Sequence, residues 1–208
     1  MYSSMLDNKF RFTNPYQISD MEERICKVKA VELLTSGDLV RNYKVGSTDS
    51  LTAIHTHLFE DMYNFAGRLR SVNMSKGNTR FTHVSYLYPA FNSVGELPQS
   101  LFKDILHKYI EMNVVHPFVD GNGRSTRIWL DYILRQELKC QINWGMINRE
   151  DYLLAMERSV IHDTELSDML LRALTPYRDI DVYTSVDGSF ALEGFVSYRA
   201  ADLVNDKT

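Results

Sequence analysis

The feature that most constrains this sequence is a helical spacing of apolar residues, which recurs along most of its length. Leu51, Ile54, Leu58, Met62 and Phe65 follow the three- and four-residue steps of an amphipathic helix and predict a helix over about residues 50–65. The same spacing predicts helices over about 19–36, 97–115, 123–138, 148–160 and 164–174, and a short last one within 189–198. We therefore expect a mainly α fold, a single helical domain whose amphipathic helices share one core.

The helical spacing gives way to short alternating stretches between residues 68 and 83. A turn signal, Lys76-Gly77-Asn78, lies between these stretches, so the segment is predicted to form a small β-hairpin. It also concentrates basic residues in a chain whose formal net charge is −4, namely Arg68, Arg70, Lys76 and Arg80. Such a cluster is either a solvated loop or a functional surface, and the residues alone leave both open.

Composition narrows the class of protein. A length of 208 residues fits one domain with an appended element and is enough to bury a core without metal or disulfide links. The acidic balance argues against direct nucleic-acid binding, and no apolar run is long enough to span a membrane. The two cysteines have no metal-ligand spacing and are expected to be reduced thiols. We therefore expect a cytoplasmic protein.

One stretch, His116 to Arg127, reads HPFVDGNGRSTR and concentrates residues that suit phosphate chemistry. Gly121, Asn122 and Gly123 lie just before a predicted helix, where successive backbone N–H groups and the helix dipole make an anion site. Arg124 and Arg127 are three residues apart on that helix and point to nearly the same side. Two guanidinium groups beside such an anion site suit a polyphosphate.

Two further residues complete the set. Asp120 is an acid among phosphate binders, which is sensible if it holds Mg²⁺ against phosphate oxygens. His116 can be neutral at physiological pH and accept a proton. Neither a P-loop nor a dinucleotide fingerprint fits the stretch, because their required glycines and lysine are replaced. His55 and His57 are two residues apart on a helix, face different directions and are expected to be ordinary helix residues rather than zinc ligands.

The stretch resembles the signature of the Fic family, H-P-F-x-[D/E]-G-N-G-R-x-x-R, and agrees with it at all nine specified positions. The helical order from about residue 50 to 175 is also similar to the Fic core, and the predicted hairpin lies where the family has its flap. The resemblance implies three segments: an N-terminal helical segment (1–47), a Fic core (48–178), and a C-terminal inhibitory helix and tail (179–208).

The resemblance also implies an activity, the transfer of AMP from ATP to a Ser, Thr or Tyr hydroxyl of a target protein with release of pyrophosphate. Each residue of the stretch takes an implied role: His116 as base, Asp120 as Mg²⁺ ligand, Asn122 with the Gly121 and Gly123 backbone as phosphate cradle, Arg124 as phosphate ligand and Arg127 as γ-phosphate ligand. Glycine at position 123, where kinase relatives have lysine, favours AMP transfer over phosphate transfer. The flap residues Lys76, Gly77, Asn78, Thr79, Arg80 and Phe81 are implied to dock the target by strand-like pairing.

A second resemblance lies near the C-terminus, where Ser189 to Gly194 reads SFALEG and is similar to the family's inhibitory motif, [S/T]-x-x-x-E-[G/N]. Ser189 and Glu193 would share one face of a helix, and Glu193 could pair with Arg127 and keep it from the γ-phosphate. On its own, a Ser and a Glu four apart are more often a solvated pair. Tyr183 and Tyr198 flank the motif and are candidate sites of self-modification.

Alternatives to AMP transfer stay open at this stage. The same fold could remove AMP, with Glu193 activating a water, or transfer another phosphate-containing group. A chain locked by Glu193 could also be an ATP-sensing interaction module without turnover, although an intact His116 argues against a pure binder. Self-association into a homo-oligomer is a further expectation from the family, with no interface indicated by the residues.

Overall fold

The computed structural model describes residues 8–36, 41–76 and 79–177 and confirms the mainly α fold class. Its helices are α1 (Pro15–Ser36), α3 (Thr48–Phe59), α4 (Leu87–Gly95), α5 (Phe102–Val115), α6 (Asn122–Leu138), α7 (Arg149–Arg158) and α8 (Thr164–Arg172). Two 3-10 turns, η1 (Val84–Tyr86) and η2 (Trp144–Met146), and four short strands, β1 (Ser75–Lys76), β2 (Thr79–Arg80), β3 (Cys140–Ile142) and β4 (Leu174–Pro176), complete the description.

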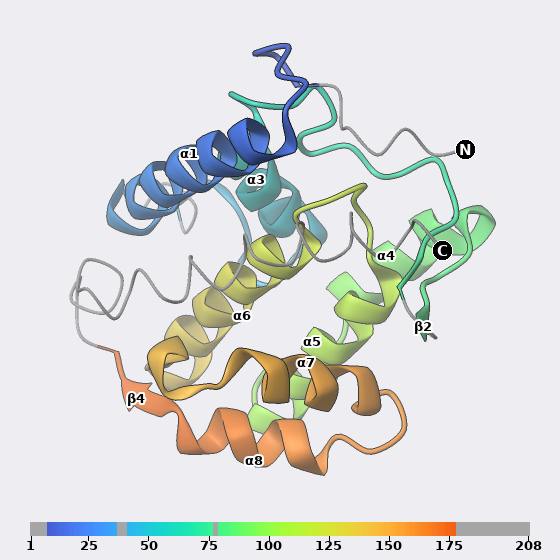
Figure 1. The fold of residues 1–208 in the computed structure, drawn as a ribbon. Coiled ribbons are helices and arrows are strands. Elements are labelled where there is room, and N and C mark those ends of the chain that lie inside the picture. Colours follow the sequence, from blue (N-terminus) through green and yellow to red (C-terminus); the bar gives the residue numbers. More distant parts are fainter. Residues whose placement is uncertain (1–7, 37–40, 77–78, 178–208) are drawn as a thin grey trace.

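The helix α6 lies at the centre of the arrangement and packs against both α3 and α5. Figure 1 shows α1 and α3 on one side of α6 and the pair α7 and α8 on the other. The core between these helices contains large side chains with 0% exposure, among them Trp129 of α6, Tyr109 of α5 and Leu51 of α3. This packing holds the start of α6 and the end of α5 in fixed positions, and the two are joined by the loop that carries the predicted site.

Helix α3 starts where its sequence predicts and ends earlier. Ser47 caps it by accepting a hydrogen bond from the Ser50 N–H at 3.1 Å. The expected end at residue 65 is wrong, because the chain leaves the helix after Phe59 through a tight turn, with the Met62 N–H donating to the Phe59 carbonyl. Met62 is nevertheless 1% exposed, since a three-residue turn returns its side chain to the same apolar face.

A short helix and a pair of strands were not predicted. Residues 87–95 form α4, a short helix with Pro89 in its first turn, and the next helix starts at Phe102 rather than at 97. The strand β3 pairs antiparallel with β4, so that Ile142 lies opposite Leu174. Leu174, the first residue of β4, was expected to end a helix, and a pairing between segments so far apart in the chain carries no local sequence signal.

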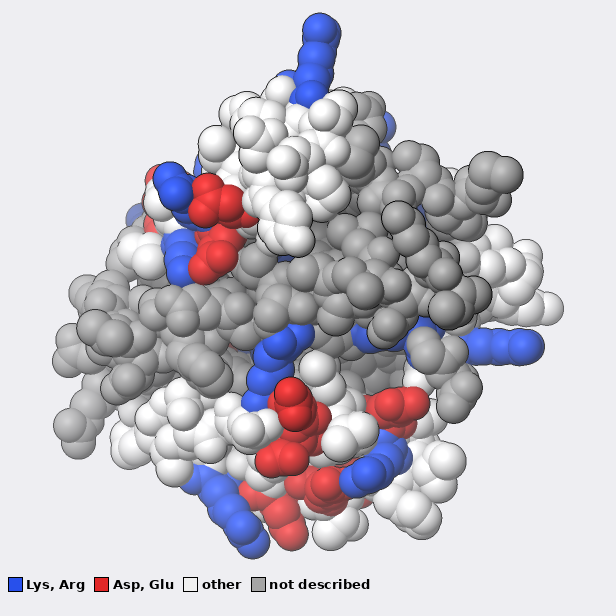
Figure 2. All heavy atoms as spheres, in the orientation of Figure 1, with Lys and Arg blue, Asp and Glu red and all other residues white. Residues whose placement is uncertain are grey.

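The predicted hairpin is present as β1 and β2, with Ser75 opposite Arg80 and Lys76 opposite Thr79. Charged side chains of both signs lie beside one another on the face shown in Figure 2, including the region over α7 and α8. One exposed pair there joins Arg158 to Glu165 at 3.0 Å. Within the described residues, no helix combines the length and apolar character that crossing a membrane requires.

Candidate active site

The predicted site lies in the loop between α5 and α6. His116 ends α5 in the left-handed region, with φ of 48°, and Pro117 follows it. The residue before a proline is disfavoured in the right-handed helical region, so the helix stops here. A non-glycine residue in this conformation is strained, and such strain is typical of functional sites that the surrounding fold holds in place.

The ring of His116 stacks on Phe81, which directly follows β2, with 3.7 Å between ring centroids and an interplanar angle of 11°. Burial, together with the positive charges of Arg70 and Lys76, lowers the pKa of His116 to about 3. The imidazole is therefore neutral at physiological pH, the state that a general base requires. The structure thus brings a predicted docking residue, Phe81, onto the predicted base.

Arg70 has a role that sequence reasoning did not assign. It is 3% exposed, and its guanidinium donates to the carbonyls of Val72, Thr82, Val115 and His116, at 2.7 Å for the last. Its backbone N–H also donates to the Pro117 carbonyl at 2.9 Å. Arg70 therefore ties the base of the hairpin to the end of α5, and the basic cluster of residues 68–80 is not a single solvated or ligand-binding surface.

The start of α6 has the geometry of an anion nest. Gly121 precedes the helix with φ of 78°, and a Cβ there would lie 2.3 Å from the Phe59 ring of α3. Only glycine satisfies both the backbone conformation and this close approach. The first N–H groups of α6 have no acceptor within the helix because of their position, and the helix dipole adds partial positive charge.

Asn122 is 2% exposed and its amide is used within the loop. Its Oδ1 accepts from the Phe118 N–H, and its Nδ2 donates to the Phe118 carbonyl, each at 2.8 Å. These two hydrogen bonds join Phe118 to Asn122, four residues later, and so close the loop. The side chain predicted to cradle phosphates therefore also shapes the loop that presents the backbone N–H groups.

Arg124 points toward α1 rather than into an open nest. Its guanidinium lies 2.6 Å from Glu22 Oε1, 3.7 Å from Asp120 Oδ2 and 4.5 Å above the Phe59 ring, and its side chain is 7% exposed. Burial acts to lower the pKa of Arg124, and the charges of Glu22, Cys26 and Asp120 outweigh this and raise it above its ordinary value. The ion pair with Glu22 was not predicted, because α1 and α6 are nearly a hundred residues apart in the chain.

Arg127 lies one turn further along α6. Its Nε donates to the Gly123 carbonyl at 3.1 Å, and its guanidinium is 5.4 Å from the centroid of the Tyr152 ring and 5.7 Å from that of Trp144. Burial lowers the pKa of Arg127. A Cβ on Gly123 would lie 3.3 Å from the Arg127 Nη2, so a larger residue at 123 would press on this guanidinium.

Asp120 suits a magnesium site in which phosphate oxygens and water supply the remaining ligands. Its carboxylate is partly buried beside the helix start, and carboxylate oxygen is a hard donor that Mg²⁺ prefers. No group of three metal-binding side chains is present among the described residues. Any Mg²⁺ at Asp120 would therefore take other ligands from phosphate oxygens and water, as is usual for this ion.

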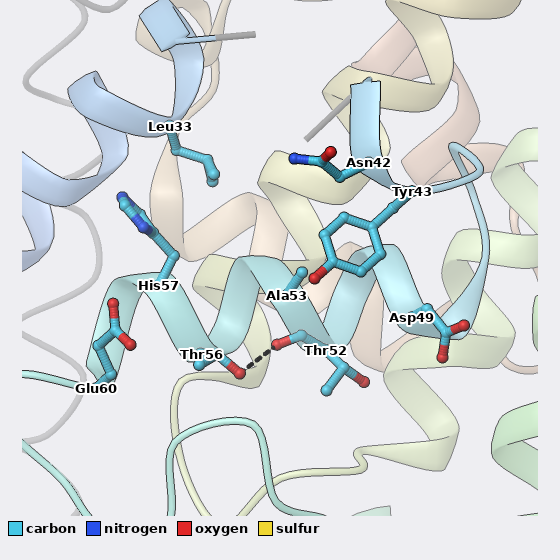
Figure 3. A pocket seen from close by; sticks show the side chains of 9 residues that line it. All are labelled: Leu33, Asn42, Tyr43, Asp49, Thr52, Ala53, Thr56, His57 and Glu60. Atoms are coloured by element: carbon cyan, nitrogen blue, oxygen red, sulfur yellow. Dashed lines mark hydrogen bonds between the residues drawn. The ribbon is translucent and has the colours of Figure 1, made fainter. Parts of the chain in front are cut away.

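His55 of α3 also belongs to the site, against the expectation that it is an ordinary helix residue. Its Nε2 lies 2.8 Å from the Asp120 carbonyl oxygen, and its ring stacks on Phe118 with 3.7 Å between centroids. His57, two residues on, instead faces a cavity of about 400 Å³ between α1 and α3. Figure 3 shows His57, Thr56 and Thr52 on α3 beside this cavity, whose lining includes no residue of the stretch 116–127.

Part of the predicted site lies outside the described residues: Gly77 and Asn78 of the hairpin, Ser189, Glu193 and Gly194 of the inhibitory motif, and Tyr183 and Tyr198. The division into segments 1–47, 48–178 and 179–208 stays a prediction. Within the first of these, α1 packs against α3 and contributes Glu22 to the site.

Comparison with known proteins agrees with this geometry. Residues 46–134 match the Fic/DOC family, so the chain contains a Fic/DOC family domain. The chain is 29% identical over 143 residues to the Probable protein adenylyltransferase Fic of Salmonella typhimurium, covering 63% of this chain and 71% of that protein. It is 26% identical over 171 residues to Protein adenylyltransferase VbhT of Bartonella schoenbuchensis, covering 71% of this chain and 36% of VbhT.

Solved structures support the fold. The BepC protein of Bartonella tribocorum, a VirB-translocated effector solved with bound AMPPNP, superposes with a TM-score of 0.71 at 14% identity, over 86% of this chain and 96% of that one. The N-terminal Fic domain of a putative cell filamentation protein of Bartonella quintana, solved with bound ADP, gives a TM-score of 0.71 at 18% identity, covering 85% and 94%. At these identities the likeness establishes a shared Fic fold.

Proposed function

We propose that this protein is a protein adenylyltransferase, which transfers AMP from ATP to a hydroxyl side chain of a target protein. The observation that carries the proposal is the loop 116–121, which holds a neutral His116 next to the nest at the start of α6. A nest alone would serve any anion binder, whereas a neutral base beside it suits transfer to a hydroxyl. The relatives named as adenylyltransferases support this choice over other nucleotide chemistry.

In the proposed reaction, His116 accepts the proton of the target hydroxyl as its oxygen attacks the α-phosphorus of ATP. The new bond joins that oxygen to phosphorus, the bond to the bridging oxygen breaks, and pyrophosphate leaves. The backbone N–H groups at the start of α6 hold the phosphates, and Arg127 orients the terminal one. Mg²⁺, held by Asp120, would neutralise charge on the phosphate oxygens.

The role proposed for Arg124 differs from the sequence expectation. Because its guanidinium is paired with Glu22 at 2.6 Å, Arg124 anchors the first turn of α6 to α1 and supplies positive potential from behind the nest. Phe81 is proposed to set the orientation of the His116 ring, while Thr79 and Arg80 of β2 remain available for strand-like docking of the target.

Autoinhibition by Glu193 is part of the proposal and rests on sequence alone. A carboxylate paired with Arg127 would withdraw that guanidinium from the γ-phosphate and leave the α-phosphate poorly aligned for attack. The position of Arg127 between Gly123 and the rings of Trp144 and Tyr152 gives a defined partner for such a carboxylate.

The test is incubation with ATP labelled at either the α- or the γ-phosphate, using wild type, Glu193→Gly, and Glu193→Gly combined with His116→Ala. Label on protein from α-labelled ATP alone, present in the single variant and absent from the double, is the expected result. His107→Ala in the Glu193→Gly background is the matched control, since His107 is exposed on the same helix, α5. Transfer from γ-labelled ATP, or turnover that survives loss of His116, would refute the proposal.

A further inference from the structure

His55 is bound at both of its ring nitrogens, and one of them contacts the catalytic loop. The Gly67 N–H donates to Nδ1 at 2.9 Å, and Nε2 lies 2.8 Å from the carbonyl oxygen of Asp120. Because Nδ1 accepts a hydrogen bond, it carries no proton, so the neutral ring has its proton on Nε2 and donates a hydrogen bond to the backbone carbonyl of Asp120. The two contacts select one tautomer and one ring orientation.

The ring is also clamped by packing. It is 0% exposed, lies 3.7 Å from the Phe118 ring at an interplanar angle of 22°, and lies 4.8 Å from that of Phe59. Gly121 passes so close that a Cβ there would be 3.2 Å from the His55 Nε2. A ring held on its faces and at both nitrogens has little freedom, so the carbonyl that it binds is held as well.

Asp120 occupies the irregular stretch between the end of α5 and the start of α6, where no helical ladder fixes the backbone. The loop is secured on either side, by Asn122 at Phe118 and by the Ser125 N–H at the Gly121 carbonyl. At Asp120 the carbonyl is bound by a side chain from α3, 65 positions away in the chain. His55 therefore determines the orientation of the peptide that carries the Asp120 carboxylate.

We propose that His55 is a positioning residue for Asp120, transmitting the position of the Gly67 peptide to the carboxylate that would hold Mg²⁺ on the phosphates of ATP. Gly67 directly precedes the segment whose Arg70 ties the hairpin to His116, so one ring joins the hairpin base to the proposed metal ligand. The proposal rests on the proposed function for the identity of the ligand, and outer partners of this kind typically alter metal affinity or activity by about 10–100-fold.

The test measures ATP binding to the 208-residue chain by calorimetry, once with Mg²⁺ and once with EDTA. His55→Phe keeps an aromatic ring for Phe118 and removes both nitrogens, whereas His55→Gln offers an amide donor near the place of Nε2. The control is His57→Phe on the same helix, whose Nε2 lies 3.1 Å from the Lys29 carbonyl and away from the loop. Circular dichroism establishes that each variant is folded.

We compare the factor by which Mg²⁺ increases ATP affinity over the value in EDTA. In His55→Phe this factor should be smaller than in wild type by about tenfold or more, while the ATP affinity in EDTA is unchanged. His55→Gln should recover part of the loss, and His57→Phe should match wild type. An equal loss with and without Mg²⁺ would mean that His55 only supports the nest, and an unchanged Mg²⁺ effect in a folded variant would also overturn the proposal.

Because these measurements need no turnover, their outcome is separate from that of the labelling experiment. Absence of labelled protein together with the expected Mg²⁺ behaviour would reject adenylyl transfer and retain the role of His55. A wild-type chain whose ATP binding does not depend on Mg²⁺ would reject the positioning role, whatever the labelling shows.

Discussion

Replacement of Glu22 by alanine is predicted to destabilise the protein strongly. Glu22 lies on α1 and pairs with Arg124 at 2.6 Å, and the side chains are 4% and 7% exposed. The other carboxylate oxygen of Glu22 accepts a hydrogen bond from the Tyr63 hydroxyl. The substitution leaves a charged guanidinium in the interior without its main partner, and a buried hydroxyl without its acceptor.

The expected magnitude follows from burial. Removing one member of a buried ion pair typically costs about 3–5 kcal/mol, because the remaining charge stays desolvated. Asp120, whose Oδ2 lies 3.7 Å from the Arg124 Nη2, compensates in part and favours the lower end, about 3 kcal/mol. For a chain of this length each kcal/mol shifts Tm by roughly 2–4 °C, so the fall in Tm should be about 6–12 °C.

The assay is thermal and urea unfolding followed by circular dichroism for Glu22→Leu, Arg124→Met and the double variant, alongside Glu22→Ala. The double variant should be more stable than the sum of its single effects predicts, since it leaves no unpaired buried charge. Asp20→Ala is the control, because its pair with Arg24 lies on the same helix with side chains 61% and 74% exposed and should contribute about 0.5 kcal/mol or less.

Two results would refute this reasoning. A loss below about 1 kcal/mol in Glu22→Ala would mean that Arg124 is adequately solvated or paired without Glu22. Additive single and double effects would mean that the two side chains do not interact in the folded state.

The remaining predictions concern other parts of the chain. Gly121→Ala should abolish ATP binding in calorimetry and lower Tm, because the new methyl group would meet Phe59 at 2.3 Å in a backbone with φ of 78°; binding at wild-type affinity would contradict this. Lys108→Met should cost about 1–3 kcal/mol in urea unfolding, because the buried Nζ donates to the carbonyls of Gly95 and Leu97 at 2.8 and 3.1 Å and these would lose their partner. The rate of AMP transfer in Glu193→Gly should stay level between about pH 8 and 6, because burial lowers the pKa of His116 to about 3 and keeps it deprotonated; a half-maximal rate near the ordinary value of 6.5 would show that the ring is solvated. The same shift requires stability to fall as pH drops from 6.5 toward 3, since the unfolded chain binds the proton that the folded one excludes.

Local patterns predicted the elements well where they were long and amphipathic. Helix α6 was expected over 123–138 and extends over Asn122–Leu138, because its apolar face and its glycine-rich start are both short-range signals. The hairpin was predicted from a turn signal between short alternating stretches. Helix α4 and the pairing of β3 with β4 were missed, since the first is short and the second joins segments whose proximity no local pattern encodes.

The residues of the candidate site divide in the same way. Those of the stretch 116–127 stood out together, because an anion site, two cations and a base fall within one short stretch of the sequence. Arg70, His55 and Glu22 did not, because an arginine, a histidine and a glutamate on separate elements have no meaning until the fold shows which loop atoms they contact. The place of His55 on the apolar helix face, four residues after Leu51 and three before Leu58, was the one available signal for it.

The sequence by itself therefore determined the helical class and singled out the stretch that forms the candidate site, because periodicity and motif spacing are local properties of the chain. Only the tertiary structure decided how the site is held. In the fold, Arg124 pairs with Glu22 and Phe81 stacks on the ring of His116. The Nε2 of His55 lies at hydrogen-bond distance from the Asp120 carbonyl oxygen. These contacts join residues from about 35 to about 100 positions apart, and packing of α1, α3 and the hairpin base against α5 and α6 brings them together.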